Sequence, residues 1–132
     1  MSKYNSKEEI AEVAAKWWTD KINFPRFDMG ATTKSEAMCE IMATVLAAKN
    51  APSEDTVSKF CSIFKEKLLE RMDKEKHIMI DVDYAPDMFL GDVMREAGVD
   101  RSLAPWKTCM SIDTNTMSIK VKHGYGDRLS EL

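Results

Sequence analysis

Apolar residues recur at helical spacing through the first half of the chain. A Ser-x-x-Glu capping box precedes the first apolar stripe, and together they predict a helix over residues 7–22. Thr33 and Glu36 repeat the capping box, and the apolar positions after them predict a second helix that ends near Asn50. Because this second segment is the most apolar of the helical segments, we expect it to be the most buried helix.

A third helical segment follows the short connection at residues 51–53. Ser53 is a good N-cap, and the two acidic residues after it suit the positive end of the helix dipole. Apolar residues keep the helical period as far as Met72, opposite a charged side. Because the connection is so short, we expect the second and third helices to pack as antiparallel neighbours.

The segment ahead of the second helix, residues 23–32, contains two helix breakers and two aromatic residues. Pro25 and Gly30 end any helical pattern, which predicts a loop. Phe24 and Phe27 are more typical of an ordered loop than of a flexible linker. We therefore expect their rings to pack against the core.

In the second half of the chain, the apolar period changes from helical to two. From His77 to Tyr84, apolar residues alternate with polar ones, which predicts a half-buried strand. A fourth helix is predicted over residues 86–97, with its proline in the first turn and Gly98 in the left-handed conformation at its C-terminal end.

The C-terminal part alternates twice, at residues 106–113 and 117–121, and this pattern predicts a β-hairpin. Polar Ser118, Lys120 and Lys122 alternate with the apolar positions, so one sheet face packs on helices and the other meets water or a partner. The predicted fold class is α+β: three N-terminal helices, then β-α-β-β with a short antiparallel sheet, in a single domain over residues 1–132.

The length and composition are typical of a folded chain, and its net charge does not favour nucleic-acid binding. A chain of 132 residues with 44% apolar and 31% charged residues can bury one core. Its formal net charge is −3, from 19 basic and 22 acidic residues, which argues against non-specific phosphate binding. We therefore expect no nucleic-acid partner.

Cysteine usage and the N-terminal sequence predict a cytoplasmic location. The three cysteines, Cys39, Cys61 and Cys109, are widely spaced without a Cys-x-x-Cys pair, which suits a reducing compartment. The first ten residues contain no apolar segment, and no apolar run approaches the roughly 20 residues of a membrane-spanning helix. Secretion and membrane insertion are not expected.

Four short motifs give the chain a family resemblance: DYAPD at residues 83–87, Gly-Val at 98–99, PWKT at 105–108 and HGYG at 123–126. With them, the chain resembles a loosely defined group of small proteins of Gram-positive bacteria and their mobile elements, which has no assigned activity. That group combines a WW-containing helix, an FDNGD-like loop, a PWKT strand and a GYG tail. Here the loop, at residues 27–31, reads FDMGA and lacks the second acidic residue. The resemblance implies a phage, plasmid or defence-related role exerted by binding.

Three charged residues, His77, Asp81 and Asp83, share one face of the predicted strand. An imidazole and two carboxylates can ligate a divalent metal or act as acid and base. However, ligands two residues apart on a strand are separated by about 7 Å, and charged residues are common on exposed sheet faces. We therefore favour a solvated face and expect no metal or cofactor.

Cys109, Lys107 and His123 could meet across the C-terminal hairpin and form a thiolate nucleophile. No signature sequence or oxyanion-hole motif accompanies the cysteine, so a packing role is favoured. The glycines at 30, 124 and 126 do not lie between a strand and a helix, which excludes Rossmann and P-loop nucleotide sites.

Two surfaces are candidates for binding. Tyr125 and the nearby basic residues form an aromatic, basic end that could stack a base or contact an acidic partner, against the simpler interpretation of a solvated strand end. The Trp17-Trp18 pair, the loop phenylalanines and Trp106 could line a pocket or partner-facing patch, although core packing is the favoured explanation.

From these patterns we expect a small protein-binding module, an inhibitor or accessory factor from a phage or other mobile element. The alternative is a small-molecule-binding protein or a small enzyme that uses the strand acids or Cys109. A homo-oligomer is also compatible with the sequence, because an amphipathic helix or an unpaired sheet edge can serve a second copy. The residues assigned to binding are Trp18, Phe27, Asp28, Trp106, Lys120, Lys122 and Tyr125.

Overall fold

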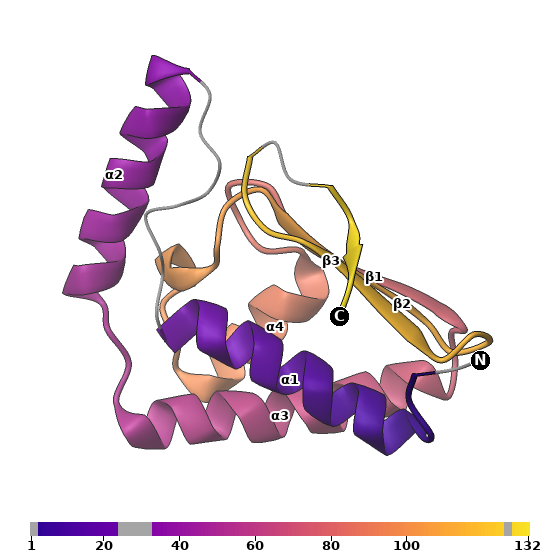
Figure 1. Ribbon diagram of the computed structural model, residues 1–132. Coiled ribbons are helices and arrows are strands. Elements are labelled where there is room, and N and C mark those ends of the chain that lie inside the picture. The colour runs from indigo at the N-terminus through magenta and orange to yellow at the C-terminus, as the bar shows by residue number, and fades with distance from the viewer. Residues whose placement is uncertain (1–2, 24–32, 126–127) are drawn as a thin grey trace.

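A computed structural model describes residues 3–23, 33–125 and 128–132 (Figure 1). In this part of the chain, three helices precede an antiparallel sheet, and a fourth helix follows the first strand, which confirms the predicted α+β class. A short 3-10 helix and a two-residue strand were not predicted. In chain order the elements are α1 (Lys7–Asn23), α2 (Lys34–Lys49), α3 (Glu54–Met72), β1 (His77–Val82), α4 (Met88–Ala97), η1 (Arg101–Leu103), β2 (Thr108–Asp113), β3 (Ser118–Lys122) and β4 (Ser130–Glu131).

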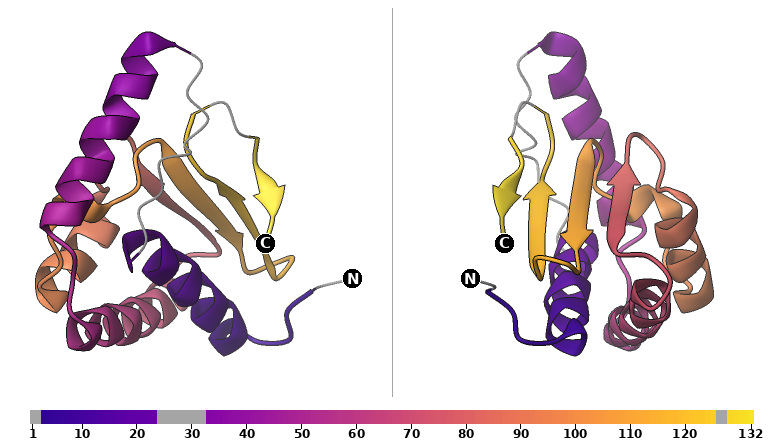
Figure 2. Two further views of the ribbon diagram at one scale, coloured as in Figure 1. Left: turned by 60° about the vertical axis from the view of Figure 1, so that its left-hand side comes forward. Right: turned by 90° about the vertical axis from the view of Figure 1, so that its right-hand side faces the viewer.

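The four strands lie in the order β1-β2-β3-β4, and each neighbouring pair is antiparallel. Side chains alternate between a buried row and an outer row, as the period of two predicted. Helices α1, α3 and α4 lie on one side of the sheet (Figure 2), and the buried row packs into the same core as these helices. The outer row contains His77, Met79, Asp81, Cys109, Ser111, Asp113, Ser118, Lys120 and Lys122.

The core is built around the contact between α1 and α3. Trp18 of α1 is completely buried, together with Phe60 and Phe64 of α3. The α1 row that includes Trp18 therefore carries most of the burial, while Trp17 is only partly buried and packs at the margin of the core. Since α1 also contacts β3, it lies between α3 and the sheet.

Two predictions about α2 are wrong. It does not pack alongside α3. It extends away from the N-terminal end of α3 and contacts the body mainly through η1 (Figure 1). It is also not the most buried helix, because Met38 and Ile41 are 60% and 50% exposed. Helix α3 packs instead against α1 and α4.

Several element boundaries differ from the predicted ones. Helix α4 begins at Met88 rather than residue 86, because Asp87 is its N-cap and accepts a hydrogen bond from the Leu90 N–H. Gly98 takes the left-handed conformation as predicted, with φ 78° and ψ 26°. β2 and β3 each begin later than expected, and Met117 lies in the turn between them with φ 51°.

Candidate functional site

Three segments that are far apart in the sequence meet at one end of the sheet. Tyr84 follows β1, Trp106 precedes β2, and Tyr125 follows β3. The rings of Tyr84 and Trp106 form an edge contact with centroids 5.2 Å apart. The Tyr125 hydroxyl donates a hydrogen bond of 3.0 Å to the Tyr84 hydroxyl. We call this group, together with Asp83 and Lys107, the sheet-end cluster.

Lys107 is held in the sheet-end cluster by its main chain and by its side chain. Its N–H donates to the Asp83 carbonyl at 2.8 Å, and its ammonium group forms an ion pair with the Asp83 carboxylate. The same ammonium lies 4.8 Å from the centre of the Tyr84 ring, a cation–π contact. The backbone of Lys107 has φ 54°, a conformation that costs a non-glycine residue about 1 kcal/mol or more. These contacts hold the strained residue in place.

Two further hydrogen-bonding residues tie the sheet end to its neighbours. Asp87 uses one carboxylate oxygen to cap α4 and the other to accept the Asp81 N–H at 2.9 Å. Thr108 is buried, donates its hydroxyl to the Trp106 carbonyl and accepts the Gly124 N–H at 3.3 Å. Three of the four motifs on which the resemblance rests, those at residues 83–87, 105–108 and 123–126, therefore contact one another within the fold.

A cavity of about 250 Å³ lies beside the sheet-end cluster. Its polar lining combines two acids, Asp81 and Asp83, with two lysines, Lys107 and Lys122, and the Cys109 thiol. In the sheet register, Cys109 lies between Asp81 on β1 and Lys122 on β3. The cavity is therefore lined by compensating charges and has no strong net field of one sign.

The environment of Cys109 does not favour a thiolate. Partial burial and the nearby Asp81 carboxylate raise the pKa of the Cys109 thiol, and Lys122 offsets this only in part. The neutral thiol therefore predominates at neutral pH. His123 does not line this cavity; its ring lies 6.4 Å from that of Trp17 on α1. The structure thus brings Lys107 and Cys109 together but not the histidine of the proposed nucleophilic group.

The three residues proposed as metal ligands are also separated. His77 and Asp81 are four residues apart on β1, a distance of about 13 Å along a strand. His77 hydrogen-bonds the Ser111 hydroxyl at 3.1 Å, and Asp83 pairs with Lys107. Among the residues with described positions, no three His, Cys, Asp or Glu side chains are grouped so that they could hold a metal ion.

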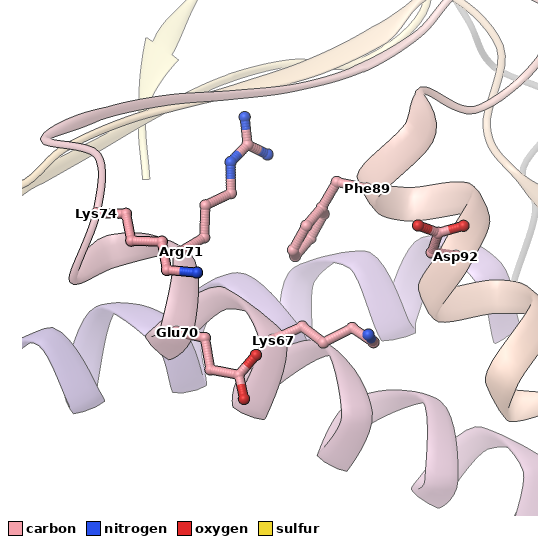
Figure 3. A pocket seen from close by; sticks show the side chains of 6 residues that line it. All are labelled: Lys67, Glu70, Arg71, Lys74, Phe89 and Asp92. Carbon is pink, nitrogen blue, oxygen red and sulfur yellow. The ribbon is translucent and has the colours of Figure 1, made fainter.

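A second concave surface lies between α3 and α4, with a volume of about 230 Å³ (Figure 3). Phe89 points from α4 toward α3, and the Arg71 guanidinium lies 5.3 Å from the centre of its ring. Two basic side chains that line this surface already form ion pairs: Arg71 contacts Glu75 at 2.8 Å, and Lys67 contacts Glu96 at 3.3 Å. An incoming anion would therefore compete with existing partners.

The outward side of α2 holds four of the eight large apolar side chains that are exposed in the described ranges. Four side chains, spaced i, i+3, i+4 and i+7, are each between 50% and 60% exposed. This spacing places them along one face of the helix. We call this set, Met38, Ile41, Met42 and Val45, the α2 stripe.

The opposite side of α2 faces the body of the protein. Cys39 interacts with the Tyr125 hydroxyl, and Asn50, just after the helix, donates to the Ser102 hydroxyl of η1 at 3.2 Å. At about 100° per residue, Cys39 and Asn50 lie on one side of the helix axis and the α2 stripe on the other. Glu36 and Glu40 also lie away from the stripe and are partly buried. The attachment of α2 to the body thus leaves the stripe exposed.

The structure distributes the predicted binding residues among three environments. Trp18 is fully buried in the core, and Tyr125 is only 8% exposed, so neither ring forms an open aromatic patch. Trp106 is half-buried in the sheet-end cluster, Lys122 lines its cavity, and Lys120 is exposed on the outer sheet face. Phe27 and Asp28 lie outside the described residues.

The α2 stripe and the Asp87 contacts were missed by the sequence interpretation. One available signal was that apolar residues occur around most of the circumference of α2, so one neighbouring helix could not have covered them all. Asp87 carried the signal of an N-cap, but the prediction placed Pro86 in the first turn and so began the helix too early.

The chain matches no protein-family model, and no curated protein matches it. In the described ranges, no helix is both long enough and apolar enough to cross a membrane.

Proposed function

We propose that this chain is a protein-binding module that docks through the α2 stripe. The observation that carries the proposal is the exposure of four large apolar side chains in one row on a helix. Contiguous exposed apolar patches commonly mark interaction sites. The spacing i, i+3, i+4, i+7 is the one by which helices anchor in a partner's groove. Two of the four residues are methionines, whose flexible side chains adapt to a partner's surface.

The biological setting is part of the same proposal. The resemblance to proteins of mobile elements favours an inhibitor or accessory factor encoded by a phage or similar element. A cytoplasmic site of action is supported by the three free cysteines, Cys39, Cys61 and Cys109, which suit a reducing compartment.

The small-molecule or enzymatic alternative has weaker support. The cavity beside the sheet-end cluster, about 250 Å³, is large enough for a small ligand, but its charges already compensate one another. The Cys109 thiol in its lining has a pKa raised by burial and by Asp81. A docking function needs no such chemistry and uses the face that the fold leaves open.

The test is capture of a partner by the tagged full-length protein from lysate of its own host, followed by native mass spectrometry. The double variant Ile41→Gln/Met42→Gln removes the centre of the α2 stripe and keeps residues that are compatible with a helix. The matched control, Met79→Gln/Met88→Gln, removes two exposed apolar side chains elsewhere, 45% and 84% exposed.

We expect wild type and control to retain the same protein at fixed stoichiometry and the α2 variant to lose it. Truncation of central interface anchors should weaken binding about 100-fold or more. Retention of the same partner by the α2 variant would contradict the proposal. Capture of only a small-mass adduct or metal would also contradict it and would favour the alternative.

A further inference from the structure

The α2 stripe is bordered by a lysine at each end. Lys34 and Lys49 are exposed and lie at the first and last residues of the helix. At about 100° per residue, both point to the same side as Met38 and Met42. They are 15 residues apart, or about 22 Å along the helix axis. The exposed face of α2 is therefore apolar in the middle and positive at both ends.

This charge pattern disfavours a second copy of the chain as the occupant. In an antiparallel pair of α2 helices, Lys34 of each copy would meet Lys49 of the other, and in a parallel pair each lysine would meet its equivalent. Both arrangements place like charges together at both ends. A stable interface also needs about 800 Å² on each partner, which one helix face about 24 Å long hardly supplies. A groove that also covers the flanks of the helix supplies more.

The composition of α2 also disfavours a lipid surface. Interfacial helices carry many lysines or arginines on the polar face and often aromatic residues on the apolar face. Here the stripe contains no aromatic residue, and the side of α2 away from it carries the acids Glu36 and Glu40. α2 contains only two basic residues, Lys34 and Lys49, fewer than such interfacial helices carry.

We infer that the occupant is a different protein with an apolar groove about 20 Å long that carries carboxylates at both ends. This inference rests on the proposed docking function and adds the chemistry of the partner. α2 enters the groove as a preformed helix, with its stripe on the apolar floor and Lys34 and Lys49 beside the two acidic ends. The stripe supplies most of the affinity, and the lysines fix the register and speed association.

The experiment uses the full-length protein with a charge-reversed α2, Lys34→Glu/Lys49→Glu. The control Lys59→Glu/Lys76→Glu makes the same change in net charge at two exposed lysines outside α2. Each protein carries a photo-crosslinking residue at Val45 and is used for capture from host lysate at low and high salt. The cross-linked segment of the captured partner is mapped, and acids beside it are replaced by lysine.

We expect charge reversal of α2 to weaken capture about tenfold at low salt and less at high salt, with the control unchanged. A partner in which the acid-to-lysine change restores binding to the charge-reversed α2 would establish the acidic rim. If capture depends on Ile41 and Met42 but not on the two lysines, the docking function stands and the acidic rim is wrong. If capture depends on neither pair, both fail.

Two measurements on the purified protein test the rejected occupants. Sedimentation equilibrium is expected to give a monomer, and sedimentation with vesicles of phosphatidylcholine and phosphatidylserine is expected to leave the protein in solution. A dimer that dissociates on Ile41→Gln/Met42→Gln substitution would overturn the inference in favour of a second copy. Vesicle binding lost by the same variant would overturn it in favour of a membrane.

Discussion

The sheet-end cluster and the α2 stripe use their side chains in opposite ways. At the sheet end, Asp83, Lys107 and Tyr125 each contact a residue from another segment. On α2, Met38 and Ile41 are large, apolar and at least half exposed. The distinctive motifs of the sequence thus serve mainly to hold the fold together, whereas ordinary aliphatic residues form its open surface. A side chain whose polar groups and rings already contact other parts of the fold is a weaker candidate for binding than one that remains largely exposed to solvent.

The strongest test of this contrast is Asp87→Ala. The substitution removes the N-cap of α4 and the acceptor for the Asp81 N–H, so we expect the free energy of unfolding to fall by about 2–3 kcal/mol. Urea denaturation followed by circular dichroism measures the loss. Asp87→Asn keeps one side-chain acceptor and should lose less. An unchanged midpoint for Asp87→Ala would show that the sheet end is not tied as the structure indicates.

Thr108→Val should have the next largest effect. The variant keeps the shape of the side chain but leaves the buried Gly124 N–H without its acceptor, at a cost of about 1–3 kcal/mol. Thr108→Ser, which keeps the hydroxyl, is the control for the hydrogen bond. If the serine variant were the less stable of the two, the methyl group rather than the hydroxyl would be the stabilising part.

Tyr125→Phe should cost about 1 kcal/mol at neutral pH through the lost bond to Tyr84. Burial and that hydrogen bond raise the pKa of Tyr125 above its ordinary value of 10.0. Because the folded state holds the neutral phenol, this stabilisation is complete below pH 10 and is lost as pH rises through the higher folded pKa. Stability measured above pH 10 should therefore fall less steeply in the variant, with Tyr4, whose pKa burial also raises, causing part of the remaining slope.

Asp81→Asn should make Cys109 more reactive. Removal of the carboxylate lowers the pKa of the Cys109 thiol, so alkylation by iodoacetamide near pH 8 should become about two- to fivefold faster. Lys122→Gln removes the charge that favours the thiolate and should slow the reaction. All rates are measured in a Cys39→Ser/Cys61→Ser background, so that Cys109 is the thiol that reacts. Equal alkylation rates in wild type, Asp81→Asn and Lys122→Gln would show that these two charges do not control the reactivity of Cys109.

Met42→Gln on the α2 stripe should change the free energy of unfolding least, by less than about 0.5 kcal/mol, because its side chain is already 54% exposed. Met94→Gln is the matched control: this methionine is fully buried in α4 and should cost several times as much. The comparison between the two regions would fail if both methionines cost the same, since α2 would then pack more closely than its exposure indicates.

Local patterns in the sequence predicted much of the fold. The capping boxes, the change of period at His77 and the glycine after α4 placed most elements within a few residues. These signals act over one or two turns of chain, so a single sequence contains them. The boundary error at Asp87 arose because an acid and a proline near a helix start offer competing signals.

The packing of α2 and the make-up of the sheet end could not be predicted in the same way. A short connection such as residues 51–53 permits α2 and α3 to pack side by side. Whether they do depends on which helix packs most favourably against α3. Here α1, which precedes α2 in the chain, is the helix that packs against α3. Likewise, Tyr84 and Tyr125 meet only because the strand register brings their segments to one end of the sheet.

The two contacts between Asp87 and Asp81 also bear on how the protein behaves when crowded. β1 is the outermost strand on its side, and a bare outermost strand offers its amides and carbonyls to any extended peptide nearby. Asp87 accepts the Asp81 amide with its carboxylate and donates its own amide to the Asp81 carbonyl at 2.9 Å. The edge of β1 at Asp81 therefore has no backbone groups left to pair with an added strand, and it carries the Asp87 carboxylate. At high concentration, the chain is protected there from templated, amyloid-like stacking.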